Sequence, residues 1–223
     1  MNKRGQGAQR FYDRWARLYD LVARETPGIK GLRSRTAAAL SLEPGDTVVE
    51  MGCGTGANLG FLRERVGPEG TVIGLDFTRG VLDRARDHVD RKGWENVHLV
   101  RADATRPPLL ESVDAVLATF VVGMLSDPSG AVEDWCELVG PGGNVGLLNL
   151  ARSRRWYGPI VNGPFRVLVV ISTPSKRRLA TGATELLDRR VKAAHGVIRD
   201  RCVEIVDEER GFGLLRLSAG RVS

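Results

Sequence analysis

Cysteine is scarce in this 223-residue sequence, and its three cysteines, Cys53, Cys136 and Cys202, lie far apart. An odd number of widely spaced thiols provides neither a disulfide framework nor the paired spacing of a zinc site. Histidine is equally rare, with three residues, and no group of histidines and carboxylates has the spacing of metal ligands. We therefore expect a protein of the reducing cytoplasm that binds no metal.

Long apolar stretches are also missing. No run approaches the roughly 18–20 residues of a transmembrane helix, and residues 1–7 lack the apolar core of a secretion signal. The composition, 42% hydrophobic and 27% charged, is that of an ordinary globular protein. A chain of this length can bury a substantial core, so we expect a single compact domain.

Acidic residues are absent between Leu138 and Thr184. Seven basic residues fall in this stretch, namely Arg152, Arg154, Arg155, Arg166, Lys176, Arg177 and Arg178. Their charge exceeds the formal net charge of the whole chain, which is +6. We infer that this stretch faces an anionic partner.

Strand-like and helix-like stretches alternate along the chain. Helices are predicted over 8–24 and 29–40, strands over 47–51, 71–75, 97–100, 114–120 and 144–150, and helices between the strands over 58–66, 79–92 and 130–139. This alternation predicts a doubly wound α/β fold, with a mostly parallel sheet covered by helices on both faces. The tail differs: a helix over 185–199 precedes strands 203–206 and 214–217, and their short connection predicts a hairpin with an antiparallel last strand.

Residues 48–56, Val-Val-Glu-Met-Gly-Cys-Gly-Thr-Gly, lead from a predicted strand into a glycine-rich loop before a helix. Glycines let backbone amides approach a ligand closely, and a helix start adds further donors. The loop by itself is ambiguous, because Gly52, Gly54 and Ala57 also satisfy the dinucleotide pattern of dehydrogenases.

Acidic residues near the ends of three predicted strands favour a different cofactor, S-adenosylmethionine. Glu50 would repel a pyrophosphate but suits a sulfonium cation and an amino group. Asp76 can accept hydrogen bonds from both ribose hydroxyls, and Phe77 can lie against adenine. Asp103 and Ala104 follow the third strand, where a carboxylate and an amide can recognise the adenine edge. The alternative is that Glu50 and Asp76 only cap helices and that the glycines only make turns.

Together these residues resemble the class I S-adenosylmethionine-dependent methyltransferases, over about residues 12–217 and including the Gly-Pro-Gly-Gly turn at 140–143. The resemblance implies a seven-stranded sheet of order 3-2-1-4-5-7-6 with strand 7 antiparallel, and S-adenosylhomocysteine as product. It implies cofactor contacts from Glu50, Gly52, Cys53, Gly54, Gly56, Asp76, Phe77, Asp103 and Ala104. The single domain then divides into an N-terminal helical lid (1–42), a cofactor-binding core (46–150), an acceptor-side insertion (151–182) and a C-terminal helix and hairpin (183–223).

The N-terminal Tyr-x-x-x-Ala-x-x-Tyr-Asp pattern at 12–20 looks like the opening of the ubiquinone/menaquinone C-methyltransferases and the bacterial phosphatidylethanolamine N-methyltransferases. The resemblance implies that Tyr19 lies near the methionine end of the cofactor and that Thr119 contacts the cofactor. The quinone enzymes carry Phe-Gly-x-Arg after the fourth strand, whereas this chain has Phe-Val-Val-Gly from Phe120. Residues 121–128 look more like the phospholipid enzymes.

The sequence indicates the methyl acceptor less clearly than the cofactor. The sequence lacks both the Asn/Asp-Pro-Pro-Tyr/Phe motif of enzymes that methylate base nitrogens and a nucleophilic cysteine after the fourth strand. Because the sulfonium is already activated, a direct displacement needs mainly alignment and desolvation. We assign no catalytic base, and we expect His88, His98 and His195 to be packing or surface residues.

Segment 151–176 combines basic residues, Trp156, Tyr157 and the apolar run 167–171. This composition suits an anionic bilayer surface, and it also suits the phosphates of a structured RNA. We predict a lipid or lipid-like small-molecule acceptor and a cytoplasmic protein that associates peripherally with the inner membrane face. An RNA methyltransferase and a non-catalytic S-adenosylmethionine-binding protein are the alternatives. An exposed apolar run would favour lipid, and a buried one would weaken that prediction.

Overall fold

A computed structural model describes residues 29–109, 112–172 and 182–223. The helix predicted over 8–24, Tyr19 and the basic triplet at 176–178 lie outside the described residues.

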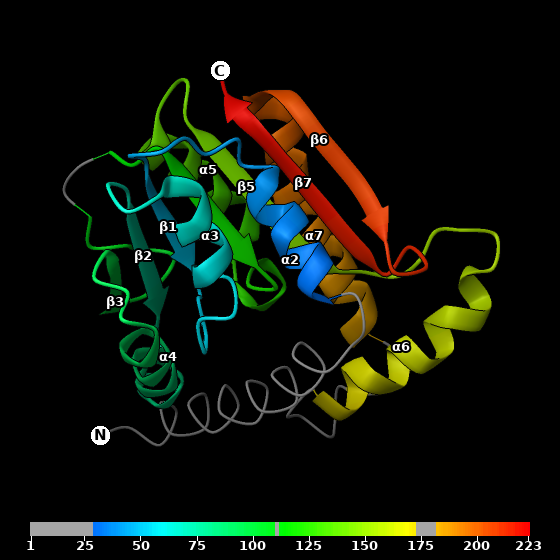
Figure 1. Cartoon of the computed structure of the whole chain (residues 1–223). Helices are drawn as coiled ribbons and strands as arrows, with labels where there is room; N and C mark the ends of the chain where they lie inside the picture. Colours follow the sequence, from blue (N-terminus) through cyan, green and yellow to red (C-terminus); the bar gives the residue numbers. More distant parts are fainter. Residues whose placement is uncertain (1–28, 110–111, 173–181) are drawn as a thin grey trace.

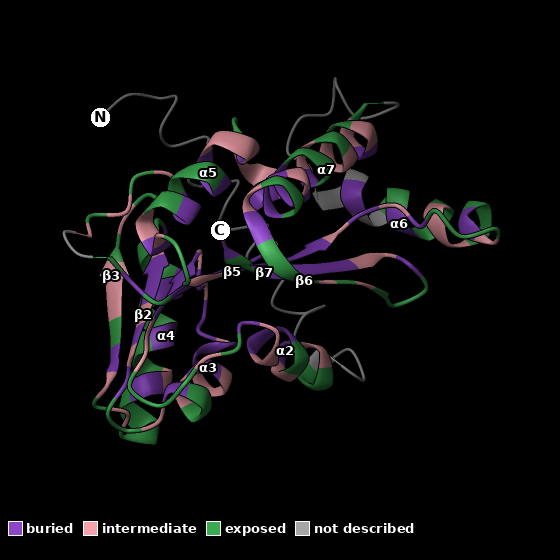
Figure 2. Ribbon diagram, turned by 90° about the horizontal axis from the view of Figure 1, so that it is seen from above, coloured by how far each residue is buried: buried purple, intermediate pink, exposed green. Residues whose placement is uncertain are grey.

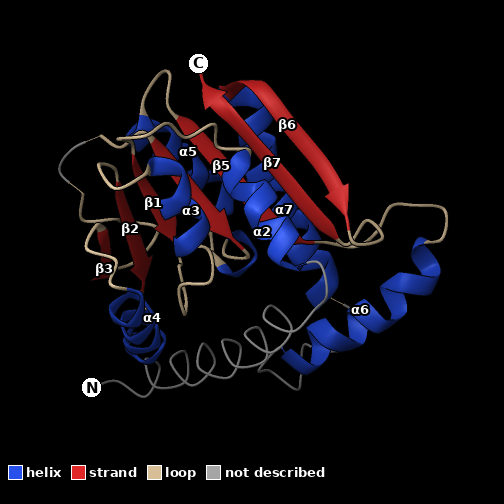
Figure 3. Ribbon diagram, viewed as in Figure 1, coloured by secondary structure: helices blue, strands red, loops and turns tan. Residues whose placement is uncertain are grey.

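Seven strands form one sheet in the order β3-β2-β1-β4-β5-β7-β6 (Figures 1 and 3). Their bounds are β1 Thr47–Met51, β2 Thr71–Asp76, β3 Val97–Arg101, β4 Ala115–Thr119, β5 Asn144–Leu150, β6 Cys202–Arg210 and β7 Leu215–Val222. The first five strands pair in parallel, and β7 runs antiparallel to both β5 and β6. The predicted strand order and the antiparallel last strand are confirmed.

Helices cover both faces of this sheet, as Figure 2 shows. On one face lie α2 (Ile29–Ala38), α3 (Leu59–Val66) and α4 (Arg79–Lys92), and on the other lie α5 (Pro128–Val139) and α7 (Ala183–Arg201). A short 3-10 helix, η1 (Val122–Met124), follows β4. The remaining helix, α6 (Gly158–Ser172), projects beyond the sheet in both views.

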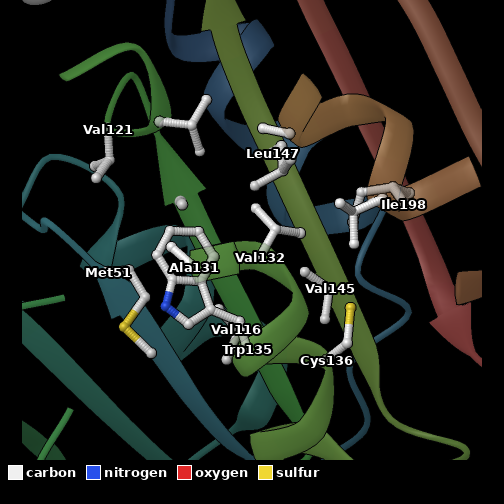
Figure 4. Packing of buried hydrophobic residues seen from close by; sticks show 14 of the residues in the cluster. Met51, Val116, Val121, Ala131, Val132, Trp135, Cys136, Val145, Leu147 and Ile198 are labelled. Carbon is white, nitrogen blue, oxygen red and sulfur yellow. The ribbon is translucent and has the colours of Figure 1, made fainter. Parts of the chain in front are cut away.

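The apolar core has one layer on each side of the sheet. Trp135 of α5 is fully buried and packs with Met51, Val116 and Val132 in one layer (Figure 4). Leu40, Leu59 and Leu62 belong to the other layer, under α2 and α3. All five residues of β4 are buried, because this central strand is covered on both faces. Because β1 pairs in parallel with β2 and β4, the carboxyl ends of these three strands lie at the same edge of the sheet.

The largest differences from the predicted boundaries are in the C-terminal hairpin. β6 and β7 extend further than expected, so the hairpin turn covers 211–214 and not 207–213. The charged residues Asp207, Glu208 and Glu209 stay within β6 because it is an edge strand with a solvated side. The apolar run 167–171, whose secondary structure the sequence left open, belongs to α6. No helix in the described part of the chain is long and apolar enough to cross a bilayer.

Candidate functional site

The glycine loop follows β1 and leads into α3. Gly52, Gly54 and Gly56 have φ values of 72°, 56° and 81°, a region that residues with a Cβ rarely adopt. A Cβ on Gly52 would lie 2.4 Å from Cγ2 of Val121, so the loop packs directly on the turn after β4. A Cβ on Gly54 would meet no protein atom within 4 Å. The loop is thus fixed on one side and open on the other.

Glu50 is buried beneath this loop, with 1% of its surface exposed. Its Oε1 accepts hydrogen bonds from Nδ2 of Asn58, at 2.5 Å, and from Oγ1 of Thr119, at 3.4 Å. Asn58 in turn donates to Oγ1 of Thr119 at 2.9 Å and accepts from Nη1 of Arg33 at 2.7 Å. The second carboxyl oxygen, Oε2, has no hydrogen-bond partner among the described residues. A buried polar atom without a partner is costly and points to a missing ligand group.

Burial raises the pKa of Glu50 to about 7, against the opposing effects of the Asn58 hydrogen bond, the Arg33 charge and the Thr119 hydrogen bond. The carboxyl therefore changes its charge near neutral pH. A cationic group next to Oε2 would favour the ionised form and would supply the missing partner.

Asp76 ends β2 and holds the glycine loop from the side. Its Oδ2 accepts from the backbone N–H of Gly54 at 3.0 Å, and its Oδ1 accepts from the N–H of Thr78 at 2.7 Å. Burial raises the pKa of Asp76, and these backbone donors partly offset that rise. Each carboxylate oxygen can still accept a further hydrogen bond. Phe77, the next residue, is 56% exposed.

Asp103 and Ala104 form the turn after β3. Oδ1 of the exposed Asp103 accepts from the N–H and the hydroxyl of Thr105, at 2.9 and 2.8 Å. The carbonyl of Ala104 accepts from Nε1 of the buried Trp135 at 2.8 Å. The backbone N–H of Ala102 donates to the carbonyl of Asp76 at 3.1 Å, which fixes this turn beside the end of β2.

The sequence analysis did not identify two residues of this network. Asn58 and Arg33 join Glu50 to Thr119 and to α2, although neither belongs to the glycine pattern. The only available signal was the position of Asn58, two residues after Gly56. The contact of Arg33 depends on how α2 packs on α3, which sequence spacing does not reveal.

Cys53 is buried within the loop, and its backbone N–H donates to the carbonyl of Leu75 at 2.7 Å. Burial raises the pKa of its thiol, so the thiol stays protonated. His195 is also buried: Nδ1 lies 2.7 Å from Oγ of Ser218, and Nε2 lies 3.1 Å from Oδ1 of Asn149. Burial lowers the pKa of His195 to about 4, which makes it a neutral packing residue.

Two of the described basic residues after β5, Arg152 and Arg155, form ion pairs within the chain. Nε of Arg152 lies 2.5 Å from Oδ2 of Asp188, and its Nη1 lies 3.1 Å from Oε1 of Glu185, both on α7. Nε of Arg155 lies 3.3 Å from Oε2 of Glu209 on β6. The anionic partner expected for the acid-free stretch stays a prediction, and these pairs show only that Arg152 and Arg155 also have partners within the chain. Acids distant in sequence approach them in the fold.

Three carboxylates thus stand at the ends of adjacent parallel strands around one glycine loop, and one of them has a buried oxygen without a partner. This arrangement fits a ligand with a cationic end, a ribose and a purine. Residues 48–143 match a family described as a methyltransferase domain. The chain belongs to the S-adenosylmethionine-dependent methyltransferases.

Among its relatives is a phosphatidylethanolamine N-methyltransferase of Cereibacter sphaeroides, 34% identical over 145 residues, which cover 63% of this chain and 66% of that protein. The ubiquinone/menaquinone C-methyltransferase of Stenotrophomonas maltophilia is 29% identical over 126 residues, which cover 55% of this chain and 50% of that protein. The chain spans less than two thirds of the length of the curated relatives it matches. A solved methyltransferase of Aquifex aeolicus shares the fold, with a TM-score of 0.64, 16% identity and coverage of 94% of this chain and 98% of that chain.

Proposed function

We propose that this chain transfers a methyl group from S-adenosylmethionine to a lipid or lipid-like small molecule, at an amine, at the surface of a membrane. The observation that carries the cofactor assignment is the buried carboxyl of Glu50, whose Oε2 lacks a partner beneath the glycine loop. A pyrophosphate would place negative charge beside this carboxyl, which disfavours a dinucleotide.

Each candidate residue has a role in this proposal. Glu50 neutralises the cationic end of the cofactor, Thr119 and Tyr19 flank it, and Asp76 accepts from the ribose hydroxyls. The loop residues Gly52, Cys53, Gly54 and Gly56 allow a close backbone approach. Phe77 lies against adenine, and Asp103 and Ala104 bind its edge. Arg33 and Asn58 join this set as groups that orient Glu50, because both are buried and hydrogen-bonded toward it.

The cofactor, when bound, supplies a methyl carbon already activated on sulfur. The lone pair of the acceptor nitrogen would form the new bond to this carbon, sulfur would keep the electron pair of the broken carbon–sulfur bond and leave as S-adenosylhomocysteine, and the excess proton on nitrogen would pass to solvent. The protein then has only to align the acceptor and exclude water, so neither a general base nor a metal is assigned.

Two observations support a lipid acceptor over RNA. The similarity to a phosphatidylethanolamine N-methyltransferase extends over 145 residues. In addition, Arg152 and Arg155 neutralise acids of the chain itself, which reduces the charge available to phosphates. The apolar run 167–171 lies partly in solvent and partly against the protein, since Val167 is 57% exposed and Val169 is 6% exposed. This run alone therefore does not separate the two acceptors.

The test is to incubate the purified protein and radiolabelled S-adenosylmethionine with a bacterial extract, and to measure label in the organic phase and in RNA. We expect label in the organic phase. An Asp76→Ala control should lose it, because its lost ribose hydrogen bonds weaken cofactor binding by about 2–4 kcal/mol. Label in RNA alone would support the RNA alternative. Cofactor binding without any transfer would support a non-catalytic binding protein.

A further inference from the structure

The projecting helix α6 presents an uncovered apolar stripe to solvent. Ile160 is 75% exposed and Val167 is 57% exposed, while Gly163 and Pro164 between them are also exposed. Trp156, about one turn before Ile160, is 90% exposed. Ile160, Gly163 or Pro164, and Val167 are three or four residues apart, so they follow one face of α6, and Trp156 lies in the turn that precedes this helix.

The packing of α6 does not require this stripe. Phe165 and Val169 are buried, with 4% and 6% of their surfaces exposed, and they lie on the other side of the helix. The helix therefore has one apolar face toward the protein and a second one toward solvent. Exposed apolar patches of this kind mark interaction surfaces in soluble proteins.

The turn between β6 and β7 extends the stripe. Phe212 at this turn is 74% exposed. A Cβ on the adjacent Gly213 would lie 2.7 Å from Oγ of Ser153 and 3.2 Å from Cγ of Arg155, so the turn lies against the segment that enters α6. The β6–β7 turn, which carries Phe212, therefore lies beside residues 153–155, which directly precede Trp156.

The segment that carries the stripe is basic, and the described acids that contact it are paired. Residues 151–172 contain no acid, and the exposed Arg154 makes no ion pair with any described residue. Glu209 is one of these acids, and its Oε2 lies 3.3 Å from Nε of Arg155. An apolar surface bordered by unpaired positive charge complements an anionic bilayer.

We infer that Trp156, Ile160, Val167 and Phe212 form a membrane-docking surface for a bilayer that contains anionic lipids. This inference rests on the proposed lipid acceptor and names the surface that would bring the site to it. A projecting helix can sink one apolar face into the boundary between head groups and acyl chains, and tryptophan favours that boundary. Arg154 adds an attraction that salt weakens.

The experiment is sedimentation of the full chain with vesicles of phosphatidylcholine alone, or of phosphatidylcholine with phosphatidylglycerol, without S-adenosylmethionine. We expect binding to the anionic vesicles. The triple variant Trp156→Ser/Ile160→Ser/Val167→Ser should lose about tenfold or more in affinity, because its buried apolar area is removed. Val203→Ser/Ile205→Ser on β6 removes other exposed apolar side chains, 44% and 38% exposed, and should bind like the unchanged protein. Arg154→Ser should weaken binding at low salt only.

Unchanged vesicle binding by the triple variant would overturn the inference, as would failure of the unchanged protein to bind anionic vesicles. If sedimentation velocity shows a dimer that the triple variant abolishes, without vesicle binding, the stripe joins two copies of this chain and the inference is wrong. Calorimetry of S-adenosylmethionine binding, and methylation of a detergent-dispersed acceptor, should be normal in the triple variant. If the unchanged protein neither binds S-adenosylmethionine nor methylates this acceptor, the proposed function is wrong, whatever the result with vesicles.

Discussion

At the scale of single residues, we propose that the charge of Glu50 makes cofactor binding depend on pH. The pKa of this carboxyl is about 7 in the folded protein and 4.5 when unperturbed, and the chief cause is burial. Between these two pH values the folded chain holds a proton that the unfolded chain releases. The stability this provides is fully present below about pH 4.5 and is lost as the pH rises through 7, a change of about 3 kcal/mol.

We therefore predict that the free energy of unfolding of the ligand-free protein falls over this range, and that Glu50→Gln removes most of the fall. The affinity of the protein for the cationic cofactor should change with pH in the opposite direction. It should increase between about pH 6 and pH 8, with release of a proton on binding, because the cofactor needs the ionised carboxylate. Calorimetry in buffers of different ionisation enthalpy measures that proton. A cofactor affinity that is flat across this range would contradict the assignment of Glu50.

At the scale of elements, we predict that two glycines of one loop affect different properties: Gly52 the stability of the fold, and Gly54 the binding of the cofactor. An alanine at Gly52 would adopt φ near 72° and bring its Cβ to 2.4 Å from Val121. We expect Gly52→Ala to cost about 2–4 kcal/mol, which lowers the melting temperature by about 5–15 °C. Adding Val121→Ala should restore part of the loss.

Gly54→Ala is the matched control on the same loop. Its φ is 56°, but its Cβ would meet no protein atom within 4 Å. We expect it to cost only about 1 kcal/mol of stability and yet to weaken S-adenosylmethionine binding about tenfold or more, because the Cβ occupies the open side of the loop. Thermal unfolding and calorimetry of both variants test this. Normal cofactor affinity in a folded Gly54→Ala protein would place the cofactor elsewhere.

Helix α7 contacts both η1 and the segment that follows β5. Arg190 donates to the carbonyl of Gly123 in η1 at 3.1 Å, and Asp188 binds both the backbone N–H and the side chain of Arg152. A Cβ on Gly123 would lie 2.4 Å from Cδ1 of Leu187, so η1 and α7 are in close contact. One helix thus fixes both the turn after β4 and the segment that leads to α6.

At the scale of the whole molecule, we predict that methyl transfer requires no added metal. In the residues that the structure describes, no three His, Cys, Asp or Glu side chains gather closely enough to hold a metal ion. The sulfonium also carries its own activation, so a displacement needs alignment more than a Lewis acid. Turnover should persist after dialysis against EDTA. Loss of turnover that a divalent ion restores would refute this prediction.

The sequence by itself determined the fold class, the strand order through the family resemblance, and the glycine loop with its acidic neighbours. These depend on local signals: short apolar strands that alternate with helices, glycines in the loop after a strand, and carboxylates next to strand ends. Glu50, Asp76 and Asp103 could therefore be named as candidates from their positions alone.

Only the tertiary structure decided which partners these groups have. Arg33 reaches Asn58 across 25 residues, and Thr119 meets Glu50 across 69 residues. Likewise, Arg152 is neutralised by acids of α7, and Trp156 and Phe212 are left exposed. Charge pairing, burial and exposure depend on which elements pack together in three dimensions, and local spacing along the chain does not contain that information.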